Sequence, residues 1–453
     1  MKIAAVFPAL VLSFWPVIAP AQGTARMERI AAFYRNRDAF MGTVVVAKEN
    51  RIVFEKSFGY AQVERQIPFE RDTRFPIGSL SKQFTAAAVL LLQQDGKLET
   101  SDPVARFYPG APAAWAHITL RNLLTQTSGI PDVDFSVATR NGAHQPEEEI
   151  KTVIAQPLKF EPGTKFDYSN VNYVLLGMAI ERASGETYCR FLEARIFRPL
   201  GLTQTGCDWR SGGVRHSASG YRPKGTGYVA AEEDDLTGIA GAGGLYSTAG
   251  NLIRWTEALH GGRVLNQASL KEMTTPFLDG YAYGLEVEDG KRISHDGAID
   301  GFYAGLDYLP GTRSIVVVLS NVNTDGNRAS PGAFAMEAEL MELLIDKDSI
   351  LPSEGKELAL SDETLRHYVG RYKATDSENA ASFTVTLQGN HLMFQADGPG
   401  NRAAQLRAES QTDFYVVDDK AELEVDFDPD GSATIVDYNE HSGIPFTRIS
   451  ESK

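Results

Sequence analysis

Apolar and polar residues follow two different patterns along this chain of 453 residues. Four segments have apolar residues at three- and four-residue spacing and are predicted helices: 79–94, 173–183, 188–197 and 249–259. Three others contain β-branched or aromatic residues and are predicted strands: 43–47 and 52–58, which form a hairpin, and 314–320. This mixture predicts an α+β domain over residues 25–346.

The pattern changes after residue 346. Residues 347–360 are largely polar, include Pro352 and are predicted to form a linker. Over residues 361–453, short alternating segments are separated by turn residues, and four are predicted strands: 383–387, 391–396, 413–417 and 422–427. Regular short strands without intervening helices predict a small all-β barrel or sandwich.

The first residues have the pattern of a secretory signal. Lys2 precedes an apolar run over 3–18 that contains two prolines, and Ala19-Pro20-Ala21 follows as a small-x-small cleavage pattern. A membrane anchor is the alternative, but the run is short and interrupted by proline. We therefore expect a signal peptide at residues 1–21, no membrane anchor, a mature chain that begins at Gln22, and a periplasmic or secreted protein.

Composition excludes several function classes. A formal charge of −15 argues against nucleic-acid binding, which needs clustered Lys and Arg. The two cysteines, Cys189 and Cys207, are too few for a zinc site. After export they could form a disulfide or remain two separate buried thiols, and the sequence alone does not decide between these. No residue cluster has catalytic metal-ligand spacing, so we expect neither metal nor cofactor.

The strongest candidate chemistry lies at the start of the first predicted helix. In Gly78-Ser79-Leu80-Ser81-Lys82, the serine and lysine are three residues apart and would share one helix face. An apolar surrounding and the positive helix N-terminus both disfavour a charged amine, so Lys82 is a plausible neutral base for Ser79. Ser-x-x-Lys also occurs at Ser353 and Ser450, but there in polar segments where no amine would be desolvated.

Two further short patterns have candidate functional side chains. Tyr168-Ser169-Asn170 precedes a predicted helix, and this position could present the tyrosine as a proton shuttle and the asparagine as a hydrogen-bond donor to Lys82 or to a substrate amide. His295-Asp296-Gly297-Ala298 comes before a predicted strand. Each pattern alone is weak, because a helix cap, a turn and a buried histidine would explain them separately.

All three patterns, in this order, resemble the serine β-lactamase and penicillin-binding-protein superfamily, and most of all its branch of class C β-lactamases, DD-peptidases, D-aminopeptidases and esterases. The resemblance covers roughly residues 27–345, and within this range it includes the stretches 123–131, 199–202 and 243–248. It implies an antiparallel sheet flanked by helices.

The resemblance also implies roles for individual residues. Ser79 would be the nucleophile, Lys82 its general base and Tyr168 a proton relay. The substrate would be bound by Asn170, His295, Gly297 and Ala298, with an oxyanion hole formed by the backbone amides of Ser79 and Ala298.

Two residues depart from the family pattern. Gln126 stands where many relatives have histidine, a change that concerns loop packing more than chemistry. His295 stands where β-lactamases usually have lysine, and a mostly neutral imidazole holds a substrate carboxylate less firmly than an ammonium group does. The second departure favours an esterase or aminopeptidase over a β-lactamase.

These observations predict a serine hydrolase that acts on a small ester or on an amide or peptide with a D-amino acid. The alternatives are a β-lactamase proper and, outside the enzymes, a sensor that is acylated without turnover. The region from residue 361 resembles the lipocalin-like domain of some relatives and opens with Tyr368-Val369-Gly370-Arg371-Tyr372. It has none of the three patterns, so we expect it to narrow access to the pocket or to mediate homo-oligomer formation.

Overall fold

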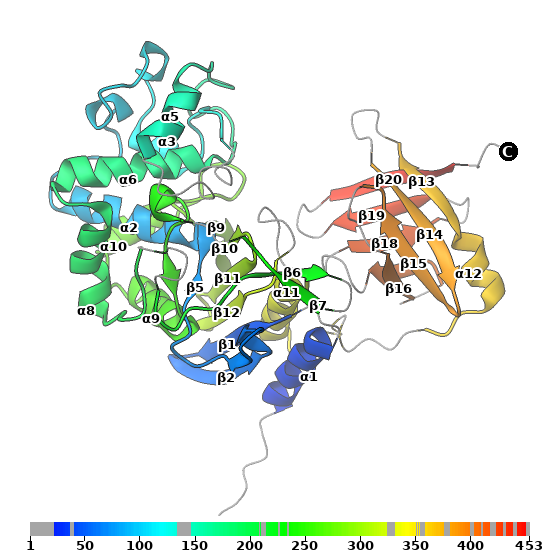
Figure 1. Ribbon diagram of the computed structural model, residues 1–453. Coiled ribbons are helices and arrows are strands. Elements are labelled where there is room, and N and C mark those ends of the chain that lie inside the picture. The colour runs from blue at the N-terminus through cyan, green and yellow to red at the C-terminus, as the bar shows by residue number, and fades with distance from the viewer. Residues whose placement is uncertain are drawn as a thin grey trace, which may run out of the picture.

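The computed structural model has two globular parts, a sheet domain and a small barrel (Figure 1). It describes residues 22–449, except for 37–39, 134–145, 208, 210–213, 225–226, 233–234, 324–330, 350, 352, 354–357, 376–380, 399–402, 409–410, 417–422, 429–431 and 438–441. The predicted signal peptide, residues 1–21, lies outside the described residues. None of the helices in these ranges is long and apolar enough to cross a membrane.

The sheet domain is built on a six-stranded antiparallel sheet with the order β2-β1-β12-β11-β10-β9. The strands are β1 (Gly42–Lys48), β2 (Arg51–Phe58), β9 (Glu286–Glu288), β10 (Arg292–Ile299), β11 (Phe302–Leu309) and β12 (Ser314–Ser320). In β11 and β12 every residue is buried, because helices cover both faces of the sheet. The predicted hairpin and the predicted strand 314–320 are therefore confirmed.

Two apolar cores lie on the two faces of this sheet. One core consists of apolar side chains from most of the helices, together with alternate strand residues such as Val45 and Val317. The other lies under the first and last helices of the domain and contains the intervening strand residues, such as Val44 and Val316. The helices are α1 (Gln22–Asn36), α2 (Ser81–Gln94), α3 (Leu120–Leu124), α5 (Pro146–Ile154), α6 (Asn170–Ser184), α7 (Tyr188–Leu192), α8 (Arg198–Leu200), α9 (Ala249–His260), α10 (Gln267–Met273) and α11 (Pro331–Ile345).

Two predicted helices differ in detail from the structure. The helix expected from Ser79 begins as a 3₁₀ turn at Gly78–Leu80, and regular α2 starts at Ser81. The helix expected over 188–197 is α7 followed by a wider π-helical turn at Glu193–Phe197. Cys189 and Cys207 form a disulfide, with 5.8 Å between their Cα atoms, which decides between the two alternatives left open by the sequence.

The C-terminal part is a closed antiparallel barrel of eight strands. It consists of β13 (Gly370–Ala374), β14 (Ser382–Gln388), β15 (His391–Ala396), β16 (Ala404–Ala408), β17 (Asp413–Val416), β18 (Leu423–Phe427), β19 (Ala433–Asp437) and β20 (Ser442–Ile449). Its interior is filled with aromatic side chains, among them Tyr372 stacked on Phe383 with ring centroids 4.8 Å apart. The predicted small all-β domain is confirmed, as a barrel.

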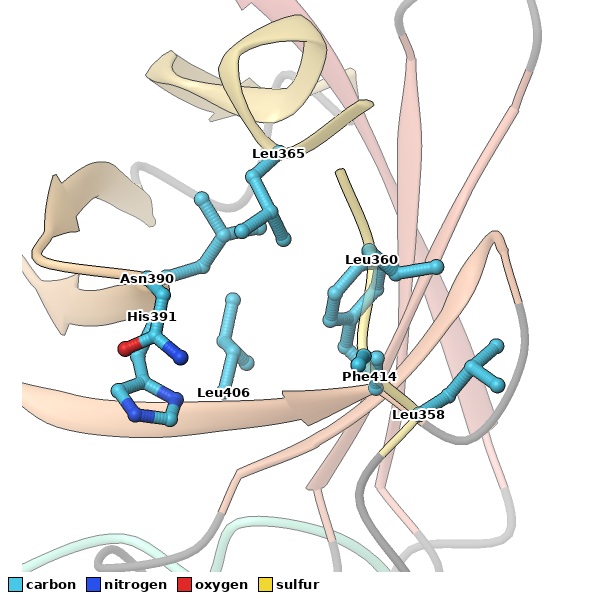
Figure 2. A pocket seen from close by; sticks show the side chains of 10 residues that line it. Leu358, Leu360, Leu365, Asn390, His391, Leu406 and Phe414 are labelled. Atoms are coloured by element: carbon cyan, nitrogen blue, oxygen red, sulfur yellow. The ribbon is translucent and has the colours of Figure 1, made fainter. Parts of the chain in front are cut away.

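A short helix, α12 (Asp362–Tyr368), lies at one end of the barrel. Between this helix and the turn at Asn390 and His391 lies a small cavity of about 140 Å³, lined mainly by apolar side chains such as Leu406 and Phe414 (Figure 2). Ligand sites usually measure roughly 300–1,000 Å³. This cavity is therefore smaller than a typical ligand site.

The connection toward the barrel is held against α1 and α11 by a buried carboxylate. Glu339 of α11 accepts hydrogen bonds from the Tyr34 hydroxyl at 2.6 Å and from the Ser353 backbone amide at 3.0 Å. Burial raises the pKa of Glu339 to about 6, and the charge of Arg407 on β16 opposes this rise. The segment after α11, through Ser353, and strand β16 of the barrel, through Arg407, thus both interact with Glu339 of α11.

Candidate active site

The candidate nucleophile lies on a tight turn between a short strand and a buried helix. Strand β5 (Phe75–Pro76) pairs with β8 (Tyr246–Ser247), and the 3₁₀ turn at Gly78–Leu80 follows. Gly78 has a φ of +49°, a conformation that glycine adopts without a steric penalty. Ser79 is partly exposed on this turn, whereas Lys82 in the first turn of α2 is fully buried.

Three oxygen atoms surround the amine of Lys82. Its Nζ atom donates to Ser79 Oγ, to Asn170 Oδ1 and to the carbonyl oxygen of Ala242, each at 2.8 Å. The expectation that Asn170 donates to Lys82 is therefore wrong, because its amide oxygen accepts from the amine. Burial lowers the pKa of Lys82 to about 7, and the nearby carboxylates of Asp132 and Asp296 oppose this fall. The amine can therefore lose its proton near neutral pH.

Tyr168 lies on the other side of this pair. Its hydroxyl forms a hydrogen bond with Ser79, and its ring centroid is 4.8 Å from Lys82 Nζ. Burial raises the pKa of Tyr168 well above its ordinary value, so the phenol is neutral. A neutral phenol can pass a proton on but cannot serve as a permanent phenolate base.

Gln126 fixes the loop that carries Tyr168. Its side-chain Oε1 accepts hydrogen bonds from the Ser169 backbone amide at 3.2 Å and from Asn172 Nδ2 at 2.6 Å. Its carbonyl oxygen also accepts from the backbone amide of Asp167. Gln126 thus fastens the loop rather than contacting Ser79, in agreement with the packing role expected from the sequence.

Strand β10 passes directly beside the nucleophile turn. Within the described residues it pairs with β9 through residues 292–294, and His295 to Ala298 extend beyond the end of β9. A Cβ atom at Gly297 would lie 2.2 Å from the Ile77 carbonyl oxygen and 2.6 Å from the Ser79 amide nitrogen. Only glycine allows this close approach, which brings the backbone of Ala298 to the nucleophile turn.

The two ring nitrogens of His295 both have partners within the protein. Nδ1 lies 2.6 Å from the carbonyl oxygen of Asp296, which can only accept, so Nδ1 is the protonated nitrogen. Nε2 is then an acceptor for the Tyr281 hydroxyl at 3.1 Å. Burial lowers the pKa of His295 to about 3, and this imidazole is neutral at physiological pH.

The structure thus gathers Ser79, Lys82, Tyr168 and Asn170 into one hydrogen-bonded cluster, with β10 beside it. Sequence reasoning did not identify Asp132, Tyr281 or the Ala242 carbonyl as parts of this site. Asp132 directly follows the stretch 123–131, which the resemblance to the family includes, but it was not itself singled out, and Tyr281 lies in a segment without a distinctive pattern. The carbonyl lies in a glycine-rich connection, where no side chain gives a signal.

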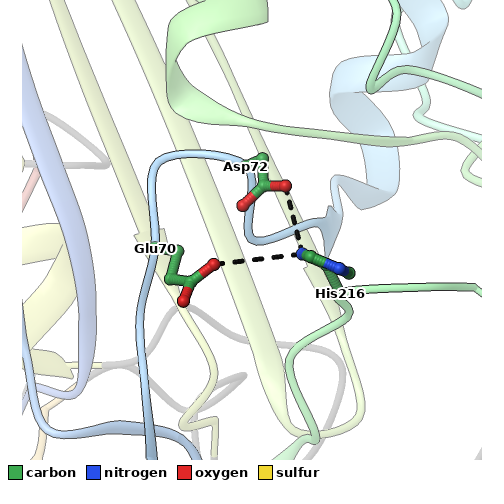
Figure 3. Close-up of side chains that lie close together, drawn as sticks. All are labelled: Glu70, Asp72 and His216. Carbon is green, nitrogen blue, oxygen red and sulfur yellow. Dashed lines mark ion pairs between the residues drawn. The ribbon is translucent and has the colours of Figure 1, made fainter.

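A separate cluster of side chains has the chemistry of a metal-ligand set. His216 Nδ1 lies 3.1 Å from Asp72 Oδ2 and 3.9 Å from Glu70 Oε2 (Figure 3). Glu70 and His216 are exposed, and an ordinary contact between imidazole and carboxylate accounts for this arrangement. The cluster shares no residue with the site around Ser79, and we assign it no role.

Comparison with known proteins identifies the family of the sheet domain. The Beta-lactamase family profile matches residues 29–339, about two thirds of the chain. The chain belongs to the Beta-lactamase family.

Two curated relatives come from Bacillus subtilis strain 168. A putative penicillin-binding protein, PbpX, is 34% identical over 64% of this chain and 73% of its own length. Penicillin-binding protein 4* is 29% identical over 89% of this chain and 94% of its own length.

Solved structures agree with this assignment to the Beta-lactamase family. An octameric penicillin-binding-protein homologue from Pyrococcus abyssi superposes with a TM-score of 0.66 over 93% of this chain and 99% of its own, at 24% identity, and shows the fold. The D-amino acid amidase from Ochrobactrum anthropi SV3 has a TM-score of 0.61 at 26% identity, over 71% of this chain and 99% of its own. Together these relatives support a serine hydrolase of the β-lactamase and penicillin-binding-protein superfamily.

Proposed function

We propose that this chain is an exported serine hydrolase that works through an acyl-enzyme on Ser79. One observation carries the proposal: a fully buried Lys82 amine lies 2.8 Å from a partly exposed Ser79 hydroxyl. A nucleophile within hydrogen-bond reach of a base with lowered pKa is the arrangement that activates serine. Export rests on the sequence of residues 1–21 alone.

The hydrogen bonds of the Lys82 amine indicate the first step of the reaction. Asn170 Oδ1 and the Ala242 carbonyl can only accept, so two N–H groups of the neutral amine stay on them. The remaining lone pair faces Ser79 and takes the hydroxyl proton while Oγ bonds to the acyl carbon. Tyr168 relays the proton from Lys82 to the departing group as the bond between that group and the acyl carbon breaks. A water molecule then gives a proton to Lys82 and attacks the acyl carbon, and the proton passes to Ser79 Oγ as the bond between Oγ and the acyl carbon breaks and the acid leaves.

The oxyanion that forms in this step needs donors beside Ser79. The backbone amides of Ser79 and Ala298 are proposed as these donors, because Gly297 lets the two segments approach so closely. Gly297 itself would border the bound substrate on the strand edge. Asn170 keeps its substrate-binding role only through the second hydrogen of Nδ2, since the first is donated to Asp132.

The substrate is proposed to be a small ester or an amide or peptide of a D-amino acid. His295 is neutral and its two nitrogens are engaged, so it offers no positive charge to hold a carboxylate. We therefore propose that it shapes the pocket together with Tyr281. The likeness to a D-amino acid amidase favours the amide, whereas β-lactams and peptides with a terminal carboxylate would lose an ion pair at this position.

A labelling experiment tests the nucleophile. A fluorophosphonate should modify one serine, Ser79, as found by intact mass and peptide mapping, and the Ser79→Ala variant should remain unlabelled. Labelling that persists in this variant would refute the assignment.

Turnover separates the enzyme from the two alternatives. A panel of p-nitrophenyl esters, D-amino-acid anilides and nitrocefin should give a burst followed by steady hydrolysis of an ester or anilide. Efficient hydrolysis of nitrocefin alone would indicate a β-lactamase. A burst of one equivalent without turnover would indicate a sensor.

A further inference from the structure

The carboxylate of Asp132 caps the helix that carries Asn170. Its Oδ1 atom accepts hydrogen bonds from the backbone amides of Asn170 at 2.8 Å and Val171 at 3.4 Å. These amides belong to the first turn of α6, where N–H groups have no partner within the helix. Ser169, the residue at the N-cap position, makes no side-chain cap bond in the described chain. Asp132 therefore supplies the cap from a distant segment.

The second oxygen of Asp132 fixes the orientation of the Asn170 amide. Oδ2 accepts a hydrogen bond from Asn170 Nδ2 at 3.1 Å, and the amide oxygen of Asn170 then faces Lys82 Nζ at 2.8 Å. A reversed amide would put its oxygen against the carboxylate and its NH₂ group against the amine. The contact between the two oxygens is unfavourable, and an NH₂ group facing Lys82 has no acceptor while the amine is protonated, so the two partners select one orientation.

This orientation determines where the Lys82 lone pair points. With the amide oxygen and the Ala242 carbonyl as fixed acceptors, the neutral amine keeps one free direction, toward Ser79. With a reversed amide, an N–H group of Asn170 would compete for the same lone pair.

We propose that Asp132 is a positioning residue that holds the Asn170 amide oxygen on Lys82 and so directs the Lys82 lone pair to the Ser79 hydroxyl. The inference rests on the proposed acyl-transfer function. In this step the Ser79 O–H bond breaks and its proton goes to Lys82 Nζ, while Oγ bonds to the acyl carbon and the π electron pair of the carbonyl moves to its oxygen.

The charge of Asp132 provides a second, independent signature. Two carboxylates, those of Asp132 and Asp296, raise the pKa of Lys82 against the larger effect of burial. The other groups around the amine are the neutral imidazole of His295 and the rings of Tyr168 and Tyr173, whose centroids lie 4.8 and 5.7 Å from Nζ. Loss of the Asp132 charge should therefore lower the pKa of Lys82 below about 7.

The test is Asp132→Asn in the full chain. The new amide can still accept from the backbone of α6 through its oxygen, but its NH₂ group would attract the Asn170 oxygen away from Lys82. The matched control is Asp167→Asn, because Asp167 adjoins Tyr168 in sequence and its side chain forms a part-exposed ion pair with Lys159 at 2.6 Å. The readout is the rate constant for acylation of Ser79 by a fluorophosphonate between pH 5 and 9, with circular dichroism as the folding control.

We expect Asp132→Asn to lower the acylation rate constant at its high-pH plateau at least about tenfold, because the base is then misoriented. The pH at which the rate constant reaches half of its plateau should also be lower than in the wild type. Asp167→Asn should match the wild type within roughly twofold in both quantities. Should Asp132→Asn fail to fold, Asp132→Ser retains an acceptor for the helix amides without the charge and should show the same two changes.

Three outcomes are informative in different ways. A lower rate with an unmoved midpoint would overturn the inference, because it would show only damage to α6. An unchanged rate would overturn it as well. Absence of Ser79 labelling in the wild type would instead refute the proposed function, so the two failures are distinguishable.

Discussion

Substitution of Gly297 by alanine should separate the two segments that form the proposed oxyanion hole. The added Cβ atom would lie 2.2 Å from the Ile77 carbonyl oxygen and 2.6 Å from the Ser79 amide nitrogen. Real Cβ contacts essentially never fall below 3.0 Å, so β10 and the nucleophile turn must move apart. Both obstacles are backbone atoms, and no side-chain rotation can relieve them.

The catalytic cost follows from this displacement. A misplacement of about 1 Å can lower a rate roughly 100-fold, and loss of one oxyanion donor costs about 10²–10³-fold, or roughly 3–4 kcal/mol. Overpacking should lower the free energy of unfolding by about 1–3 kcal/mol. We therefore expect Gly297→Ala to remain folded and to lose at least about 100-fold in kcat/KM.

The assay compares acylation and turnover of Gly297→Ala with those of Gly250→Ala. A Cβ atom at Gly250, on α9, would meet nothing within 4 Å, so the same chemical change there should leave the rate unaltered. Thermal unfolding of both variants reports on the fold. If Gly297→Ala retained more than about a third of the wild-type kcat/KM, the close approach would not be needed for catalysis and the oxyanion-hole assignment would fail.

Three further predictions concern the base, stability and the barrel. Lys82→Ala and Tyr168→Phe should each lower kcat at least about 100-fold, and the two losses should not add in the double variant. Wild-type kcat/KM should rise with pH through about 7 as Lys82 loses its proton. Acylation of Lys82→Ala at the wild-type rate would contradict this. Burial lowers the pKa of His260 to about 4, below about 6.5 in the unfolded chain, so the unfolded state gains a proton first and stability falls between about pH 7 and 4. Urea unfolding at pH 7.5 and at pH 5 should show this loss as a lower free energy of unfolding at pH 5. The difference between the two pH values should be smaller in His260→Gln, and an equal difference would contradict this prediction. A chain that ends at Asp346 should still be acylated but should differ in preference for short or long acyl esters or in light-scattering mass, and unchanged values throughout would refute a role of the barrel in access or assembly.

The local part of the site could be predicted from the sequence. Ser79 and Lys82 are three residues apart at the start of one buried helix, and this spacing fixes their contact almost regardless of the remaining fold. The β-rich C-terminal region was also predictable, because strand periodicity is a local property. Closure of its eight strands into a barrel was not, because the pairing of β13 with β20 joins residues more than 70 positions apart.

The non-local part of the site escaped sequence reasoning for a physical reason. Asp132 and Asn170 are 38 positions apart, and the hydrogen bonds of Asp132 to Asn170 and Val171 exist only because its segment passes the N-terminus of α6. Tyr281 meets His295 only after β9 has turned the chain back onto β10. Aspartate and tyrosine in such segments resemble many others, so no single-sequence pattern could have distinguished them.

The reactivity proposed for Lys82 depends on a balance that no local pattern contains. At its ordinary pKa of 10.5, only about one lysine in 3,000 would be neutral at pH 7, and the Ser79 hydroxyl would seldom meet a base. Burial alone would lower the pKa of Lys82 below about 7, and an amine with a very low pKa is a weak proton acceptor. Asp132 and Asp296 oppose the effect of burial and keep the pKa of Lys82 at about 7, so the amine can lose its proton near neutral pH while retaining useful basicity. The two carboxylates lie on separate segments from α2, and the fold must therefore be complete before Ser79 becomes a nucleophile.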